Sequence, residues 1–186
     1  MNKSEKAYLL YLVRNEIAKR LRIKWQGYKD VKTTAPAELN QKKGTFVTLT
    51  IGDNLRGCIG QITPDETMEE TIKENAISAA FHDPRFEPLT EGEFYKIDVE
   101  ISILSVPQRL DLEKVEQDVH GVIIKCKGRS ATFLPQVWED LPSKDEFFSH
   151  LCMKAGLSCD EWKKGTLEVY TYTVEHFNET ELKLGL

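Results

Sequence analysis

The apolar positions along the chain follow two spacings, which separate the expected helices from the expected strands. Over residues 4–23 the apolar side chains recur three and four positions apart, as on one buried face of a helix: Ala7, Leu10, Val13, Ile17 and Leu21. Ser4 stands before the first of them and suits an N-cap. The pattern predicts a helix at residues 4–23, followed by a loop through residues 24–44.

A second helix is expected where several start signals stand together. Thr63 suits an N-cap, Pro64 suits the first helical position, and Glu66 would complete a capping box. The helix should end near Phe81, because the residue before Pro84 resists helical geometry. Its inward positions are Met68, Ile72, Ala76 and Ala79.

Alternation of apolar and polar residues predicts the strands. Thr45–Ile51 is rich in β-branched residues, and turn residues lead from it to a second strand near residues 56–62, so a hairpin is expected. The clearest alternation lies at residues 97–103, which indicates a half-buried antiparallel strand. The remaining expected strands are residues 119–126 and 130–134, joined as a hairpin, and residues 167–174 before a polar tail.

Two further capping boxes predict helices in the last third of the chain. Ser143 with Glu146 opens a helix through Ala155, and Ser158 with Glu161 opens a short one ending near Gly165. Hairpins interspersed with helices indicate an α+β fold, with a mainly antiparallel sheet and flanking helices. Subdomain crossings are expected near residues 52–64 and 105–110, the second at a proline that breaks the strand pattern.

Composition limits the classes of protein that fit. The 186 residues, 40% apolar and 30% charged, suit one globular domain, and no run approaches the roughly 18 apolar residues of a membrane span. The amino terminus lacks signal-peptide features, so we expect a cytoplasmic protein. Residues 1–43 carry a net charge of +7 and the remainder −12, and this acidic remainder argues against a broad nucleic-acid surface.

Four cysteines without a CxxC pair indicate reduced thiols. A zinc site can be drawn from His150, Cys152 and Cys159, but its spacing matches no common ligand pattern. A helical Cys152 that faces the core fits better. We therefore predict no metal site and no cofactor in this chain.

The segment Leu55-Arg56-Gly57-Cys58-Ile59-Gly60 carries the candidate chemistry. In extended chain, Arg56 and Cys58 point to one face, about 6.6 Å apart along the strand, while Leu55 and Ile59 point to the core. A neighbouring guanidinium favours the thiolate form of cysteine. The arrangement suits a nucleophile or an anion pocket, and it equally suits a buried structural cysteine.

The glycines of this segment have two readings. Gly60 would leave the Cys58 face uncovered, and Gly57 would let another backbone or a ligand approach closely. Both could instead only permit a β-bulge.

A second set of candidates follows the helix that ends near Phe81. His82 could serve as general base for Cys58, and Arg85 could hold an anion beside Asp83. In the alternative reading, Asp83 and Arg85 form a structural turn clamp while His82 is solvated. Gln136 could place an amide near the site, although a strand-ending turn explains it as well.

The six-residue segment resembles the hallmark of the AMME-syndrome candidate-gene family, also called AmmeMemoRadiSam system protein A. Four further segments are similar to that family: Gly44-Thr45-Phe46-Val47, Ala79-Ala80-Phe81-His82-Asp83-Pro84-Arg85-Phe86, Phe133-Leu134-Pro135-Gln136-Val137-Trp138 and Leu151-Cys152-Met153-Lys154-Ala155-Gly156-Leu157. The resemblance implies one AMMECR-type domain over residues 1–186, in which two subdomains form a cleft that contains the hallmark. It also implies a Memo-type protein and a radical SAM protein as partners, but no particular reaction.

Three uses of the site are compatible with the sequence. In the first, Cys58, Arg56 and His82 are catalytic and act on a small anionic substrate. In the second, the ligand-binding residues recognise a ligand without turning it over: Arg56, Gly57, Cys58, Gly60, Asp83, Arg85 and Gln136. In the third, the chain docks on a partner through its apolar first helix or the cleft rim. The radical SAM cofactor would belong to the partner, since this chain lacks a three-cysteine cluster.

Overall fold

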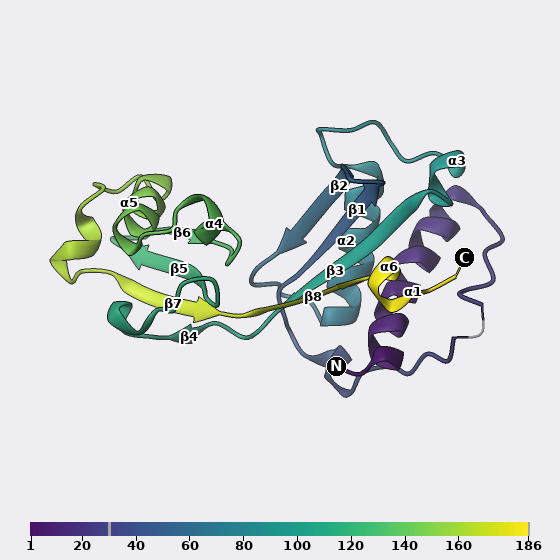
Figure 1. The fold of residues 1–186 in the computed structure, drawn as a ribbon, viewed down its shortest axis with the longest axis horizontal. Coiled ribbons are helices and arrows are strands. Elements are labelled where there is room, and N and C mark those ends of the chain that lie inside the picture. Colours follow the sequence, from purple (N-terminus) through teal and green to yellow (C-terminus); the bar gives the residue numbers. More distant parts are fainter. Residues whose placement is uncertain (30, 186) are drawn as a thin grey trace. The chain divides into compact units, whose positions relative to one another are not determined.

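The computed structural model describes residues 1–29 and 31–185, and its contacts divide the chain into two units (Figure 1). Unit 1 comprises Met1–Ile103 and Glu175–Leu186, and unit 2 comprises Leu104–Val174. Each unit holds a four-stranded sheet whose recorded strand pairs are antiparallel, together with helices. The predicted α+β class is confirmed. Residues 52–64 lie inside unit 1, and the chain passes between the units at residues 103–104 and 174–175.

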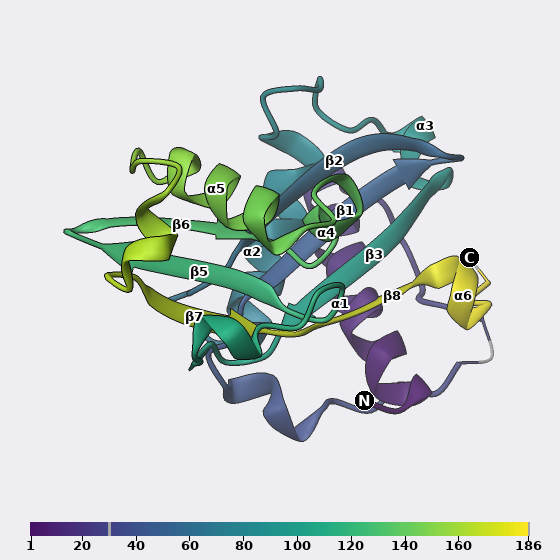
Figure 2. The same cartoon turned by 60° about the vertical axis from the view of Figure 1, so that its left-hand side comes forward.

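The sheet of unit 1 has the strand order β2-β1-β3-β8 (Figure 2). Its strands are β1 (Thr45–Ile51), β2 (Asn54–Gln61), β3 (Ile97–Leu104) and β8 (Val174–Asn178). The expected hairpin at the start of the sheet and the strand near residues 97–103 are therefore confirmed. The expected strand at residues 167–174 is instead two strands, because the chain leaves one sheet at Tyr172 and joins the other at Val174.

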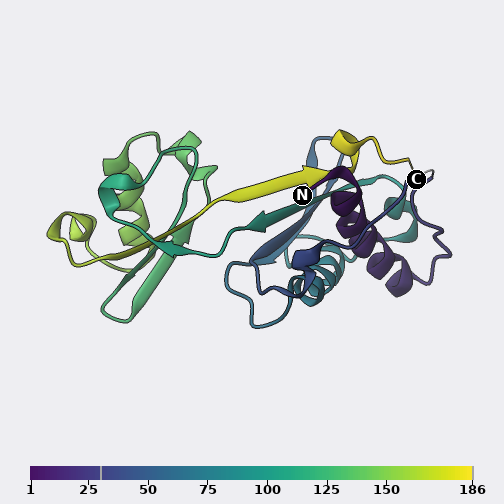
Figure 3. The same ribbon diagram turned by 90° about the horizontal axis from the view of Figure 1, so that it is seen from below.

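Two long helices cover one face of that sheet. They are α1 (Lys3–Leu21) and α2 (Met68–Phe81), which lie next to each other (Figure 3). The shorter elements of unit 1 are the 3-10 turn η1 (Ala37–Asn40), α3 (Glu91–Phe94) and α6 (Glu179–Leu182). The apolar residues of α1 are buried in the core of unit 1, so they do not offer the docking surface considered from sequence.

The starts of both long helices differ from the prediction. Asn2, not Ser4, caps α1. Two Thr-x-x-Glu boxes follow one another before α2, and the second is used, with Thr67 as N-cap and Glu70 closing the box. Thr63 and Pro64 lie in the preceding turn. The second box is used because a helix that starts there has the fully buried Met68 as its first residue.

A buried ion pair joins α1 to α6. Arg14 is 0% exposed and donates through Nε and Nη2 to the two carboxylate oxygens of Glu179, at 2.7 Å each. The Tyr28 hydroxyl also donates to Glu179, and burial is the main cause that raises the pKa of Tyr28 above its ordinary value. The segment after β8, expected as a polar tail, is thus part of the core of unit 1.

The sheet of unit 2 has the order β4-β7-β5-β6. Its strands are β4 (Gln108–Arg109), β5 (Gly121–Cys126), β6 (Arg129–Phe133) and β7 (Glu168–Tyr172). Its helical elements are η2 (Leu112–Lys114), α4 (Val137–Asp140), α5 (Lys144–Lys154) and η3 (Glu161–Lys164). Ser143 caps α5 as predicted, whereas the box at Ser158 gives only the 3-10 turn η3, with Asp160 at its start.

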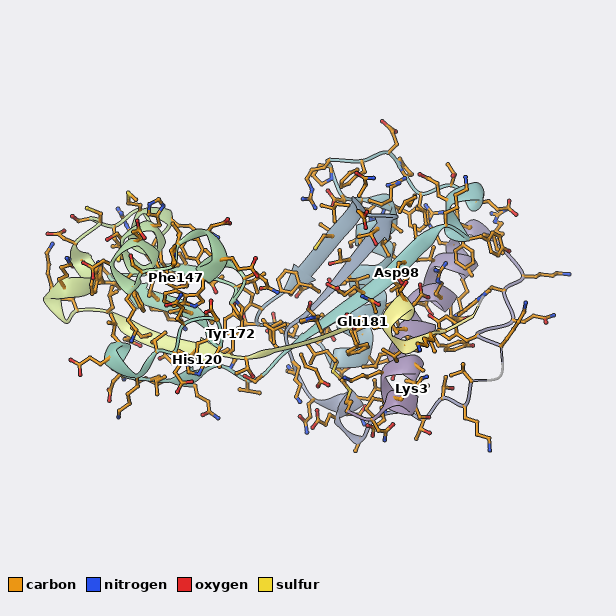
Figure 4. The ribbon with its side chains drawn as sticks, viewed as in Figure 1. Lys3, Asp98, His120, Phe147, Tyr172 and Glu181 are labelled. Atoms are coloured by element: carbon orange, nitrogen blue, oxygen red, sulfur yellow. The ribbon has the colours of Figure 1, made fainter. Side chains whose placement is uncertain are left out.

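Aromatic side chains form the core of unit 2. Phe147 lies inside the unit (Figure 4), and its ring stacks on Trp138 with centroids 3.6 Å apart. Cys152 is fully buried in the same cluster, which confirms that this helical cysteine faces the core.

In the described part of the chain, no helix is long and apolar enough to cross a membrane.

Candidate functional site

The hallmark segment forms most of β2, but the strand is not regular. Leu49 pairs with Gly57 while Thr50 pairs with Leu55, so the register shifts and Arg56 is the additional residue of a β-bulge. The predicted alternation of side chains between the two faces of the sheet therefore fails before Arg56, at Leu55. Ile59 packs against the core of unit 1 as expected, whereas Leu55 is 41% exposed and is not an anchor.

Both glycines of β2 are required by close packing. A Cβ on Gly57 would lie 2.1 Å from the carbonyl oxygen of Ala79, so this position lets β2 approach the backbone of α2. A Cβ on Gly60 would meet the ring of Phe46 at 2.2 Å. Gly60 is thus covered by an aromatic ring, and the expectation that it leaves the strand open is wrong.

Cys58 lies on the face of the sheet opposite α2. Its register partner in β1 is Thr48, and both side chains are half-buried. The Cys58 Sγ and the Thr48 Oγ1 are 3.2 Å apart, within hydrogen-bond distance. The candidate nucleophile therefore has a hydroxyl partner that no pattern in the sequence had indicated.

Asp83 and Arg85 bind the two backbone polar groups of Cys58, its N–H and its carbonyl. The Cys58 N–H donates to Asp83 Oδ2 at 2.9 Å, and the Cys58 carbonyl accepts from Arg85 Nη2 at 3.2 Å. Arg85 also donates to both carboxylate oxygens of Asp83, at 2.9 and 2.7 Å. The Asp83 side chain is buried, and hydrogen bonding by Arg85 is the main cause that holds its pKa far below the ordinary aspartate value. The structural clamp considered from sequence is present.

Arg56 is paired with acceptors in the segment between α2 and the end of α3. Its Nε and Nη2 donate to Glu93, at 2.8 and 3.2 Å, and Nη2 also donates to the Glu87 carbonyl at 2.8 Å. Hydrogen bonding by Arg56 lowers the pKa of Glu93 to about 2. Within the described residues, Arg56 Nη1 is buried without a hydrogen-bond partner. The charge of Arg56 is therefore already balanced beside a carboxylate.

The other predicted residues are less closely tied to Cys58. His82 ends α2 as an exposed C-cap whose N–H donates to the Ser78 carbonyl, and no hydrogen bond to Cys58 is recorded among the described residues. Gln136 is exposed in the turn that starts α4 in unit 2. This agrees with the alternative reading of Gln136 as a residue of a strand-ending turn. The described residues contain no group of three His, Cys, Asp or Glu that could hold a metal ion.

Two residues beside Cys58 were missed by the sequence reading, Thr48 and Glu100. Thr48 pairs with Cys58 on one side and with Glu100 of β3 on the other, so the three side chains form a row across the face of the sheet opposite α2. Glu100 is one of the polar positions of the alternating strand predicted at residues 97–103. Only the register between β1 and β3 shows that it belongs here.

The fold and the site define a class of two-unit α+β protein, with a clamped cysteine strand in the larger unit. A family model named AMMECR1 matches residues 10–177, and the chain belongs to the AMMECR1 family.

Relatives support this assignment. A protein of Methanosarcina acetivorans is 42% identical over 83% of this chain and 81% of its own length. Protein MK0488 of Methanopyrus kandleri is 37% identical over 95% of this chain and 89% of its own length. The crystal structure of the uncharacterized protein PH0010 from Pyrococcus horikoshii superposes with a TM-score of 0.71 at 32% identity, over 95% of this chain and 91% of that one. These relatives establish the family and the fold.

Proposed function

We propose that this protein acts on a small anionic substrate in an AmmeMemoRadiSam-type multi-protein system in the cytoplasm, with Cys58 as the reactive group. The observation that supports this most is the environment of Cys58. A half-buried thiol lies against a hydroxyl, and the Arg85 guanidinium is bonded to the same residue's carbonyl. The thiolate is the nucleophilic form of a cysteine, and the Thr48 hydroxyl is placed to donate a hydrogen bond to the Cys58 sulfur.

Arg85 is a better candidate than Arg56 for holding an anion. Each of these arginines is bonded to a carboxylate and to a carbonyl, but the Arg85 side chain is 53% exposed whereas the Arg56 side chain is 13% exposed. Arg85 uses Nε and Nη2 for the clamp, and no hydrogen bond of its Nη1 is recorded within the described residues. A second pair of donors can therefore face an incoming oxygen atom without breaking the clamp.

Anion binding can be measured with inorganic phosphate as the probe. Thermal unfolding is followed at constant ionic strength while phosphate replaces chloride, because a ligand that binds only the folded state raises the Tm. We expect a Tm increase in the wild type, a reduced one in Arg85→Ala, and an unchanged one in Arg20→Ala, which alters an exposed arginine of α1. An equal Tm increase in all three proteins would overturn the role of Arg85.

A non-catalytic ligand-binding module is the second candidate. It is favoured by the clamp, which fixes the backbone of Cys58 through contacts that do not involve sulfur. The variant Cys58→Ser separates the two candidates. If Cys58 is the reactive group, this variant retains phosphate binding and loses covalent labelling at residue 58 by a thiol-reactive substrate analogue. If the module only binds, the phosphate response persists, and the wild type also remains unlabelled.

The multi-protein system needs its own experiment. Tagged protein, isolated under reducing conditions from its native cell, should carry a Memo-type protein or a radical SAM protein in stoichiometric amount. The radical SAM cofactor would be supplied by that partner. Recovery of the chain without either partner, under conditions where known complexes of the same cell survive, would count against this part of the proposal.

A further inference from the structure

The row across the face of the unit 1 sheet opposite α2 joins a thiol, a hydroxyl and a carboxyl group. Cys58 in β2 and Glu100 in β3 are both register partners of Thr48 in β1, which lies between them. Directly paired residues of antiparallel strands have Cβ atoms about 4.5–5.5 Å apart, so their side chains are within contact range. The Cys58–Thr48 contact is already formed at 3.2 Å.

The surroundings of Glu100 favour its protonated form. Glu100 is half-buried, and burial is the main cause that raises the pKa of its carboxyl group above the ordinary value. The acids Asp98 and Glu181 raise this pKa further, while His176 lowers it (Figure 4 shows Asp98 and Glu181). A carboxylate that holds a proton more strongly than usual is a better base for a weak acid such as a thiol.

We propose that Glu100 is the base that receives the thiol proton of Cys58, with the Thr48 hydroxyl carrying the proton between them. The thiol S–H donates to Thr48 Oγ1 while the Thr48 O–H passes its own proton to the Glu100 carboxylate. The products are a Cys58 thiolate, an intact threonine hydroxyl and a neutral Glu100. The number of protons and the total charge are unchanged, and no oxidant or co-reactant is needed.

This relay rests on the proposed use of Cys58 as the reactive group, and it replaces His82 as the base. His82 is exposed at the end of α2, whereas Cys58 lies on the face of the sheet opposite that helix. Thr48, in contrast, is in contact with the sulfur. The relay therefore places the base within the sheet itself.

The pH dependence of Cys58 alkylation tests the relay. Iodoacetamide is a neutral reagent that reacts with the thiolate, and mass spectrometry of the peptide containing residue 58 reports the rate. The background is Cys159→Ser, because Cys159 is exposed whereas Cys126 and Cys152 are buried. In a protein without an internal base, the rate falls about tenfold per pH unit below the thiol pKa. An internal base gives a plateau between the two pKa values of the pair, because the thiolate with neutral Glu100 then has a constant share of the protein, and the rate falls again only below the lower value.

Three variants locate the base. We expect Glu100→Gln and Thr48→Val to lose the plateau, so that their rates fall about tenfold per pH unit across the range in which the parent rate is level. Thr48→Ser keeps the hydroxyl and should keep the plateau. At high pH Glu100→Gln should react at least as fast as the parent, because it removes a negative charge near the thiolate. A general structural loosening would instead raise the rate at every pH.

The matched control is Asp98→Asn, which removes a carboxylate from the same face of β3 at a position that pairs with Thr50 outside the row. Because Asp98 also raises the Glu100 pKa, this variant should move the plateau to lower pH without removing it. The relay is overturned if Glu100→Gln and Thr48→Val give the parent profile, or if Asp98→Asn loses the plateau to the same degree. Phosphate binding through Arg85 is measured separately, so a failed relay and a failed proposed function give different results.

Discussion

The Asp83 carboxylate accepts a hydrogen bond from the backbone N–H of Cys58 at 2.9 Å, and this contact ties the turn after α2 to the candidate strand. Arg85 completes the link by donating both to Asp83 and to the Cys58 carbonyl. The position of the thiol is thus set by main-chain contacts. Substitutions at residue 58 can change its chemistry without releasing the strand.

Replacing Asp83 should weaken the fold more than replacing an exposed aspartate. The Asp83 carboxylate accepts from the Cys58 N–H and from Arg85, and in Asp83→Asn one of its oxygens becomes an amide N–H₂, which cannot accept. We therefore expect a loss of about 2 kcal/mol in the free energy of unfolding. The control Asp65→Asn changes an exposed side chain and should stay within about 0.5 kcal/mol of the wild type. Urea denaturation measures both. Equal unfolding midpoints would show that the clamp contributes nothing to stability.

Gly57→Ala should be among the most damaging small substitutions in unit 1. The added Cβ would lie 2.1 Å from the Ala79 carbonyl oxygen, so β2 must move away from α2, at a cost of about 3 kcal/mol. Gly92→Ala is the control, because a Cβ there meets nothing within 4 Å. Chemical denaturation should show a large loss for the first variant and almost none for the second. Similar losses in both would mean that β2 can shift at little cost.

The predictability of the fold differed between elements for identifiable reasons. Alternation found β3 because its inward residues form a regular series on one buried face. It failed at Leu55, since a β-bulge at Arg56 reverses the order of faces; the glycines of the segment allow a bulge but do not fix its position. The α2 start was misplaced because Thr63 and Thr67 both open acceptable capping boxes, and only burial of Met68 decides between them.

The candidate site was predictable as a set of residue types, but not as a set of contacts. Residues 82–86 could be named from a turn pattern, and one of the two readings, the clamp of Asp83 and Arg85, matches the structure. The partner of that clamp is a backbone amide of a distant strand, which no spacing rule encodes. Glu100 was missed for the same reason, because its place beside Thr48 depends on strand register.

The ion pair between Arg56 and Glu93 predicts an acid-dependent contribution to stability. The Glu93 pKa is lowered from 4.5 to about 2 in the folded protein, mainly by the Arg56 hydrogen bond. For a lowered pKa, the stabilisation is fully present above about pH 4.5 and is lost as the pH falls toward about 2. Because the carboxylate is partly exposed, Glu93→Gln should cost only about 1 kcal/mol at pH 7.

The difference between wild type and Glu93→Gln should shrink between pH 4.5 and pH 3. Urea unfolding at these two values and at pH 7 gives the three free energies needed. Glu91→Gln, which changes an exposed residue of the same short helix, should show no such convergence. A gap between wild type and Glu93→Gln that stays constant down to pH 3 would contradict the lowered pKa.

The buried pair of Arg14 and Glu179 should dominate the stability of unit 1. Arg14 also donates to the carbonyls of Phe94 and Ile97, so Arg14→Met removes a donor from those oxygens and leaves the buried Glu179 carboxylate without its cation. The expected loss is about 3–5 kcal/mol. Arg20→Met, on the exposed side of the same helix, loses only a contact over the Phe81 ring and should cost less than about 1 kcal/mol.

Because Arg14→Met risks failing to fold, Tyr28→Phe provides a milder measurement. It deletes one donor to Glu179 and should cost about 1–2 kcal/mol. In the double variant Arg14→Met/Glu179→Gln no buried charge is left unpaired, so it should be more stable than Arg14→Met alone. If the double variant were less stable than the single one by the full cost of Glu179→Gln, the two side chains would be energetically independent. The C-terminal segment would then be held to α1 by its apolar residues alone.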